Sequence, residues 1–257
     1  RSVPMLTSWD DHDFGANDAG GSFAFKEYAE KAYETYWNAS DEVKSRPGVY
    51  ESRIVGPEGK RVQFILLDTR FFRSDLVRMP YRDPGPALGW YLPNEDRKAT
   101  LLGEAQWAWL EQELRKPAEL RLLVSSIQVV VEGHGWEGWR LFPRERDRLW
   151  RTVHEARAGG VVFLSGDRHI GALYRSDTGT PYPFYELTSS GMTHPWRDAN
   201  EAGPNRLGPL FTELHVGVVD IDWAARRLTL ALHDRPARRF VRPGTQSSVI
   251  DAQIGRA

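Results

Sequence analysis

Two short segments of the chain combine side chains that bind metal ions and move protons. Residues 10–13 read Asp-Asp-His-Asp, and Asp167 and His169 stand two apart much later in the chain. Carboxylate oxygens and an imidazole nitrogen together suit Mn, Fe or Zn, and Ca is favoured as the share of oxygen ligands rises. Adjacent acids also repel one another unless a cation lies among them. Together, the two segments predict two sides of one metal site.

Each segment also has an ordinary structural interpretation. An isolated Asp-x-His fits a surface turn with a salt-bridged aspartate, and Asp10 or Asp13 fits a cap of backbone amides in an acidic turn. In the metal interpretation, Asp167 and His169 lie in an extended segment and present an oxygen and a nitrogen to the same side. Acids on both sides of His12 favour its protonated form, which suits a general acid. The presence of both segments in one chain favours the metal interpretation.

Arg70 and Gln128 are further candidates because each follows an apolar stretch. The planar fork of Arg70 suits the oxygens of an anionic substrate, and the alternative is an ion pair with Asp68 or Asp75. For Gln128, we expect either support of the site and its substrate or a buried amide with internal hydrogen bonds.

His134 and Ser190 belong to two segments that we place near the same site. His134 precedes Trp136 and Trp139, and this group predicts either an aromatic rim over the substrate or a packing cluster. Ser190 lies in a polar loop, and we expect it to support the site from behind the directly binding residues.

The elements that position these residues begin with short apolar runs of strand length. Such runs lead into the polar clusters at residues 10–13, 68–70, 125–128 and 165–169. In open α/β sheets, ligands bind at the carboxyl ends of the strands, so the clusters predict strand ends that converge on one site. The expected strands are residues 3–6, 62–67, 122–124, 161–164 and 184–187.

Helical patterns alternate with these strands. We expect helices at residues 23–38, 103–115 and 143–158, and a hairpin of residues 215–222 and 227–234 with one solvated face. Residues 78–96 are rich in proline and glycine and predict a surface loop. The mixture indicates an α/β protein, and the absence of a linker-like stretch favours one domain over residues 1–257.

Composition excludes several other classes of protein. Lys and Arg number 34 against 35 for Asp and Glu, and this balance disfavours a nucleic-acid-binding surface. There are no cysteines, so thiolate metal sites are excluded, and no apolar run has the length of a membrane span. The Gly-x-Ser-x-Gly elbow of serine hydrolases and the glycine-rich phosphate loops are also absent.

The ordered motifs resemble those of the alkaline phosphatase D (PhoD-like) family in the calcineurin-like metallophosphoesterase superfamily. The resemblance covers nearly the whole chain and rests on TSWDDHDFGANDAG, FILLDTRFFRS, LLGEAQWAWLEQEL, VSSIQVV, WRLFPRERDRLW, FLSGDRHIGALY and YELTSSGMTH. It implies a two-sheet β-sandwich flanked by helices, with a dinuclear metal centre at the strand ends. The implied metals are Fe, Mn, Zn or Ca, and the implied substrate is a small phosphate ester.

The resemblance also implies roles for single residues. Asp11, Asp167 and His169 would be metal ligands, His12 would assist the leaving oxygen, and Arg70 would help to stabilise the oxyanions. The nucleophile would be a metal-bound hydroxide. Asp10 and Asp13 would support this group. By the same resemblance we expect export to the periplasm or the extracellular space, although the chain shows no signal peptide.

One departure from the family pattern concerns the start of the chain. The family carries two earlier metal-binding blocks, an Asp-x-Cys/His-like segment and a Gly-Asp-x-x-Tyr/Asp segment, whereas nine residues precede Asp10 here. We therefore expect an N-terminally incomplete sandwich that forms the C-terminal part of the family's catalytic domain. The alternative function is that of a catalytically incomplete chain that binds one cation or a phosphorylated ligand.

Overall fold

A mixed sheet of seven strands forms the centre of the computed structural model, which describes residues 3–83, 89–234 and 246–253. Its strands are β1 (Glu51–Val55), β2 (Val62–Leu66), β5 (Leu120–Ser125), β6 (Val161–Ser165), β7 (Gly171–Ser176), β8 (Phe184–Ser189) and β9 (Arg206–Phe211). The order is β1-β2-β5-β6-β8-β7-β9. Strands β2, β5, β6 and β8 run parallel, so their carboxyl ends meet at one edge. The outer strands pair antiparallel.

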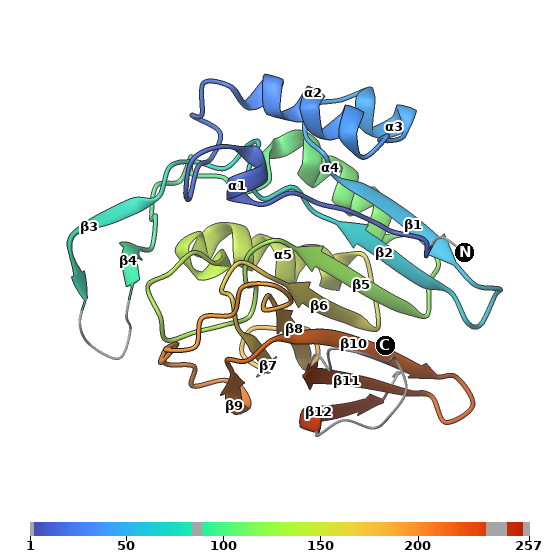
Figure 1. Cartoon of the computed structure of the whole chain (residues 1–257). Coiled ribbons are helices and arrows are strands. Elements are labelled where there is room, and N and C mark those ends of the chain that lie inside the picture. The colour runs from blue at the N-terminus through green and yellow to red at the C-terminus, as the bar shows by residue number, and fades with distance from the viewer. Residues whose placement is uncertain (1–2, 84–88, 235–245, 254–257) are drawn as a thin grey trace.

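The remaining described strands form a smaller sheet and a ribbon. The three-stranded sheet consists of β10 (His215–Asp222), β11 (Arg227–Asp234) and β12 (Gln246–Gln253), all antiparallel. The ribbon consists of β3 (Val77–Asp83) and β4 (Gly89–Leu92), and it projects at the left of Figure 1.

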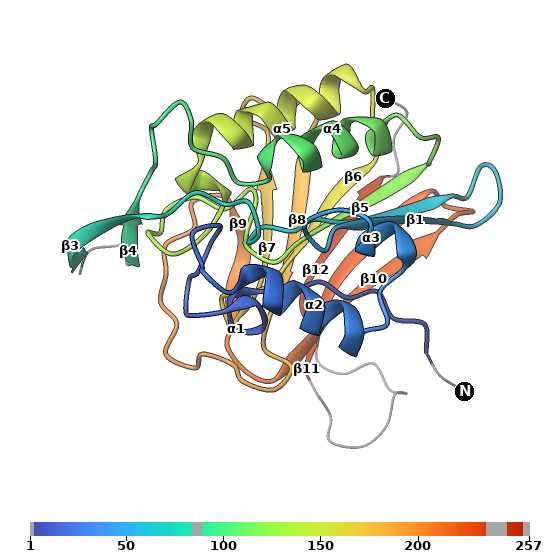
Figure 2. The same cartoon turned by 90° about the horizontal axis from the view of Figure 1, so that it is seen from above.

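Two of the helices cover the face of the large sheet that the small sheet leaves open. The helical segments are α1 (Asp11–Phe14), α2 (Lys26–Tyr36), α3 (Asp41–Lys44), α4 (Gly103–Leu114), the 3₁₀ turn η1 (Trp139–Leu141) and α5 (Pro143–Glu155). Figures 1 and 2 show α4 and α5 together on one face of the large sheet, and β10 to β12 over the opposite face. Within the described ranges, no helix has the length and apolar character needed to span a membrane.

Alternating side chains of the large sheet supply two separate cores. In β6, Val162 packs in the cluster that contains Leu230 of the small sheet, whereas the next residue, Phe163, packs in the cluster that contains Leu149 of α5. This pattern follows from the two-residue repeat of a strand, which sends neighbouring side chains to opposite faces. Burial on both faces therefore fixes the register of the strands whose ends carry the polar clusters.

The predicted α/β class with a two-sheet β-sandwich flanked by helices is confirmed. The expected strands at 62–67, 122–124, 161–164 and 184–187 correspond to β2, β5, β6 and β8. The predicted final hairpin is β10 and β11, which pair from His215↔Asp234 to Asp222↔Arg227. The three expected helices correspond to α2, α4 and α5 with shifted ends.

Two expectations about the elements were wrong. Residues 3–6 form no strand, because Val3 and Met5 are exposed and Pro4 has no N–H for a ladder. Residues 78–96 are not simply a loop, since most of the β3–β4 ribbon lies there. Strands β1, β7, β9 and β12 were not anticipated.

Candidate active site

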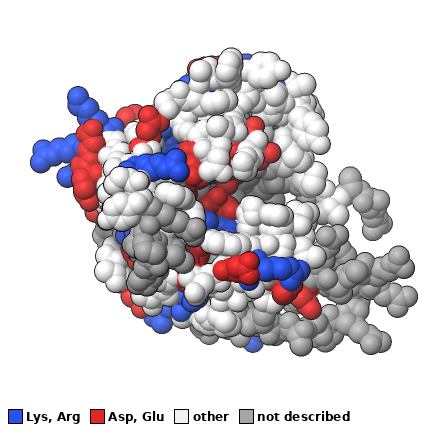
Figure 3. All heavy atoms as spheres, turned by 60° about the vertical axis from the view of Figure 1, so that its left-hand side comes forward, with Lys and Arg blue, Asp and Glu red and all other residues white. Residues whose placement is uncertain are grey.

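One cleft of about 830 Å³ brings the two predicted metal-binding segments together. Asp11 and His12 reach it from α1, and Asp167 and His169 reach it from the segment that follows β6. Figure 3 views this side of the molecule and shows acidic atoms recessed between its upper and lower parts. The full lining is Asp10, Asp11, His12, Asp13, Asn17, Asp18, Arg78, Trp90, Tyr91, Trp136, Asp167, Arg168, His169, Ser190 and Trp196.

The α1 side of the cleft is a single helical turn whose acids are held by local hydrogen bonds. The carboxylate of Asp11 accepts from the backbone N–H of His12 at 2.9 Å and from that of Asp18 at 3.0 Å. Asp13 accepts from the backbone N–H of Asp10 at 3.3 Å, which is the capping role considered from the sequence. The imidazole of His12 is 74% exposed, and its Nε2 lies 3.9 Å from Asp11 Oδ2. His12 is therefore free to meet a ligand while Asp11 is fixed.

The segment after β6 is not extended, contrary to the sequence-based expectation. Asp167 and His169 both have left-handed backbone conformations, with φ of 66° and 55°. Residues other than glycine rarely adopt this region, and such conformations gather at functional sites. The two side chains still line the same cleft. A tight bend rather than strand alternation thus brings them there.

Burial and like charge make Asp167 a poor place for an unpaired negative charge. Burial raises the pKa of Asp167 to about 7, and the nearby charge of Asp10 adds to the shift. Burial and the neighbouring His194 lower the pKa of His169, and the two rings lie 5.1 Å apart between centroids. A buried carboxylate whose burial outweighs the nearby positive charges of Arg168 and Arg70, beside a neutral imidazole, is a donor pair that fits a metal ion.

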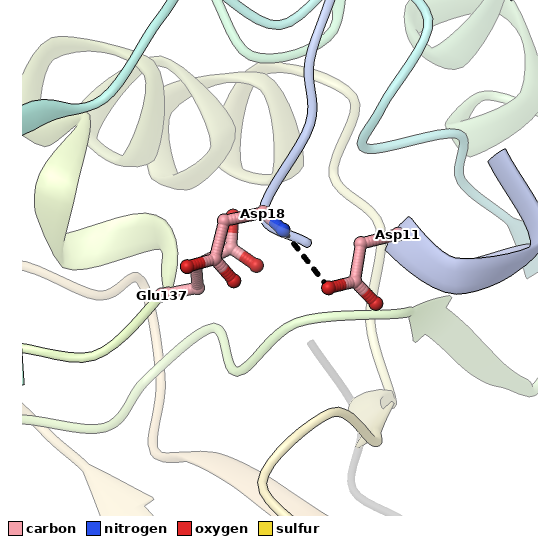
Figure 4. A group of neighbouring side chains, drawn as sticks. All are labelled: Asp11, Asp18 and Glu137. Atoms are coloured by element: carbon pink, nitrogen blue, oxygen red, sulfur yellow. Dashed lines mark hydrogen bonds between the residues drawn. The ribbon is translucent and has the colours of Figure 1, made fainter. Parts of the chain in front are cut away.

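The predicted ligands do not form one tight cage in the described part of the chain. There, the group of acids whose ligand atoms lie within 4.8 Å of one another is Asp11, Asp18 and Glu137, shown in Figure 4. No such group within the described residues includes Asp167 or His169. The oxygens of Glu137 already accept hydrogen bonds from two arginines. The structure thus places Asp11 with partners other than its predicted co-ligands.

Arg70 lies in the interior, and its guanidinium is bound between two carboxylates. Its Nε and Nη2 donate to Asp10 at 2.8 and 2.5 Å, and Nη1 and Nη2 donate to Glu137 at 2.9 and 2.8 Å. The ion-pair partners differ from the predicted Asp68 and Asp75. This geometry favours positioning of Asp10, and the role of Arg70 as an oxyanion ligand stays a prediction.

Arg73, Asp18 and Tyr91 extend the same network, and sequence reasoning had not selected them. Arg73 donates to Glu137 and to the backbone oxygen of Asp18, and the Tyr91 hydroxyl donates to the Asp18 carboxylate. Burial and the neighbouring Arg70 lower the pKa of Arg73 to about 9. Asp18 lies five residues after the acidic segment of residues 10–13, so its position in the sequence could have indicated a place in the site. Nothing in the sequence indicates such a place for Glu137.

Gln128 and His134 lie behind the cleft rather than in it. Both are fully buried, and His134 accepts a hydrogen bond at Nδ1 from the Trp136 backbone. Its Nε2 must then carry the proton and donate to Gln128 Oε1 at 2.9 Å, and Gln128 donates onward to Tyr174 and Thr188. Burial lowers the pKa of His134, which keeps the ring neutral. Their part is therefore support, whereas Ser190 lines the cleft itself.

The predicted aromatic group divides between the cleft and the core. Trp136 lines the cleft, while Trp139 is fully buried and donates from Nε1 to Ser125 Oγ at 3.1 Å. The cleft position predicted for an aromatic rim therefore applies to Trp136, and the predicted packing role applies to Trp139.

Comparison with known proteins shows which protein family this chain resembles. The family model described as PhoD-like phosphatase matches residues 1–215. Alkaline phosphatase D from Bacillus subtilis (strain 168) is 27% identical over 187 residues, covering 65% of this chain and 31% of that protein. A solved structure of PhoD matches with a TM-score of 0.64 at 18% identity, over 96% of this chain and 51% of that one. The chain thus spans 31% of the length of the first relative and 51% of that of the second.

Proposed function

We propose that this chain, which belongs to the PhoD-like phosphatase family, hydrolyses phosphate mono- or diesters with the help of metal ions. The observation that carries the proposal is the shared cleft: Asp11 and His12 meet Asp167 and His169 although the chain separates them widely. Carboxylates beside an exposed imidazole are the groups that metal-assisted hydrolysis requires.

The donor set fits a metal ion, and Asp11, Asp167 and His169 would hold it. Asp167 supports this fit, because its raised pKa reflects a buried charge that an adjacent cation would compensate. When bound, Fe, Mn, Zn or Ca would polarise the phosphoryl group and make water more acidic. We expect two ions in a complete enzyme of this family.

The chain's own residues would orient the substrate and move a proton. His12 stands at the cleft with an exposed ring beside Asp11, and we assign to it proton donation to the leaving alkoxide oxygen. Asp10 would be held in place by Arg70, and Arg70 in turn by Glu137. Ser190 adds a hydroxyl to the lining.

The test is turnover of p-nitrophenyl phosphate and its bis ester with Fe, Mn, Zn or Ca added. We expect His12→Ala and His169→Ala to lower kcat by about a hundredfold or more, the usual contribution of a positioned acid or base. His154→Ala, an exposed helical histidine away from the cleft, is the matched control. Equal rates in all variants, or no turnover even in a longer form of the protein, would contradict the proposal.

A second candidate function is binding of one cation or of a phosphorylated ligand without turnover. The observation in its favour is that Asp11 groups with Asp18 and Glu137 rather than with Asp167 and His169. Metal titration followed by elemental analysis distinguishes the two functions. Two tightly held ions per chain would exclude the second candidate, and one ion without hydrolysis would favour it.

A further inference from the structure

The lining of the cleft contains a second chemical group beside the acids and histidines. Three tryptophans and two arginines, which we call the aromatic wall, line the same cleft: Trp90, Trp136, Trp196, Arg78 and Arg168. Each tryptophan is half-buried rather than sealed in the core. Large aromatic rings left partly open in a cleft are typical of ligand sites.

Ring contacts join the members of the aromatic wall. The rings of Trp136 and Trp196 lie 5.8 Å apart at an interplanar angle of 89°. The guanidinium of Arg168 lies over both of them, at 4.8 and 5.4 Å from the ring centroids, and its Nη2 donates to the buried Glu201 at 2.5 Å. Arg168 is therefore engaged with the rings and with a carboxylate, and it holds the two tryptophans in a fixed relation.

The aromatic wall is attached to the residues proposed for hydrolysis. Arg168 stands between Asp167 and His169 in the chain, and the backbone N–H of Trp196 donates to the backbone oxygen of His169 at 2.7 Å. A substrate whose phosphorus is near Asp167 and His169 would therefore place its organic groups within reach of these rings.

A close approach of two backbones fixes the third tryptophan. Gly89 has a φ of 142°, and a Cβ added to it would lie 2.1 Å from the carbonyl carbon of Gly135. The backbone N–H groups of Trp90 and Tyr91 both donate to the Gly135 oxygen, at 3.0 and 2.9 Å. The ribbon is thus joined to the chain directly before Trp136, which His134 holds from behind. The wall is built in advance rather than formed by mobile side chains.

We propose that the aromatic wall is the subsite for an organic group of the ester and that it selects phosphate esters carrying a flat ring. The inference rests on the proposed function, because it assigns the phosphorus end of the ligand to Asp167 and His169. Flat rings stack on or against tryptophan, whereas a small aliphatic group leaves the same surface in water.

Two diesters with the same leaving group test the proposal through turnover. Methyl 4-nitrophenyl phosphate and bis(4-nitrophenyl) phosphate both release 4-nitrophenolate, so the retained methyl or aryl group is the main difference. We expect kcat/KM to favour the aryl diester by about tenfold, in line with one good ring contact. Trp136→Ala and Trp196→Ala should lower this preference to about threefold or less, and Trp196→Phe should restore most of it.

Binding of phenylphosphonate and methylphosphonate, measured calorimetrically with added metal, gives a readout without turnover. We expect about tenfold tighter binding of the phenyl ligand and loss of that difference in Trp136→Ala, with Trp37→Ala as the control outside the cleft. Equal affinities in the unaltered chain, no binding of the phenyl ligand, or a preference that survives both alanine variants would overturn the inference. Ring-selective binding without hydrolysis would instead contradict the proposed function and still support the aromatic subsite.

Discussion

Arg70 and Arg168 are two buried arginines next to one cleft, and the structure holds them by opposite means. Arg70 uses all five of its N–H donors, on Asp10, Glu137 and the backbone oxygen of Ala19. Arg168 makes one hydrogen bond to Glu201, and its Nε has no partner among the described residues. Its other contacts are the faces of Trp136 and Trp196.

This difference indicates two roles: Arg70 holds other side chains in place, and Arg168 shapes a surface for ligand binding. The guanidinium of Arg70 uses its donors on Asp10, Glu137 and a backbone oxygen, so it fixes the positions of these two acids, of which Asp10 lines the cleft. A guanidinium stacked on rings shapes a surface that a ligand can touch. The two arginines should therefore respond to mutation in different measurements, stability for one and selectivity for the other.

The largest expected effect comes from removing Glu137, the carboxylate that Arg70 and Arg73 share. Glu137→Ala leaves Arg70 and Arg73 as buried cations without their shared carboxylate. Removing one partner of a buried pair costs about 3–5 kcal/mol, so we expect the free energy of unfolding to fall by that amount in urea denaturation. A loss below about 1 kcal/mol would show that the network is not structural. Glu132→Ala, at a partly exposed ion pair, is the matched control.

Trp136 and Trp139 offer a second comparison between a cleft residue and a core residue, and the larger of the two expected losses of unfolding free energy is similar to that of Glu137→Ala. Trp139 is fully buried, so Trp139→Ala should cost about 3–5 kcal/mol of unfolding free energy, as for other core aromatics. Trp136 is half-buried and lines the cleft, so Trp136→Ala should cost less than about half as much. Thermal unfolding of the two variants side by side decides this, and equal losses would place both rings in the core.

Arg168→Lys should have a smaller effect, confined to selectivity. Lysine keeps the charge beside Glu201 but loses the flat group that stacks on the two rings. We expect the preference for phenylphosphonate over methylphosphonate to fall by about threefold, or roughly 0.7 kcal/mol, and unfolding to change little. An unfolding loss as large as that of Glu137→Ala would remove the distinction between the two arginines.

An ion pair near the surface has an expected effect as small as that of Arg168→Lys, and it provides a reference for the buried ion pairs. Hydrogen bonds from Arg61 lower the pKa of Glu119 from 4.5 to about 2. A lowered pKa in the folded state means that the stabilisation is present above pH 4.5 and is lost as the pH falls towards 2. We expect Glu119→Gln to lower the unfolding free energy at pH 7 by about 0.5–1 kcal/mol, and this difference should disappear as the pH falls through 2. A difference that stays the same below pH 2 would argue against the ion pair as its cause.

Sequence reasoning reached the parts of the site that follow from chain direction and strand ends. The polar clusters after three apolar runs were predicted to meet, and parallel β2, β5 and β6 bring them to one edge. His12 was predicted to join His169 and lines the same cleft, but it reaches it from α1 rather than from the end of a strand. The same reasoning misplaced residues 3–6, because four apolar-looking residues do not distinguish a strand from an exposed segment that enters a helix.

The partners of buried charges were beyond that reasoning. For Arg70 the sequence offered the nearby Asp68 and Asp75, but Glu137 lies 67 residues away along the chain and meets it only through folding. Asp68 instead accepts hydrogen bonds from the Trp9 indole, 59 residues away, and from the nearby backbone N–H groups of Arg70 and Phe71. Charge pairing over such distances depends on which interior site each side chain reaches, and composition does not record this.

The contact between Gly89 and Gly135 has a consequence for how this protein can change over generations. The ribbon supplies Trp90 to the cleft, its backbone meets the rest of the chain at Gly135, and none of the proposed metal ligands lies on it. Substitutions in the ribbon could therefore retune which esters are accepted while the hydrolytic residues stay as they are. Proteins with this fold would then acquire new substrate preferences through changes in the β3–β4 ribbon alone, provided that Gly89 and Gly135 are retained.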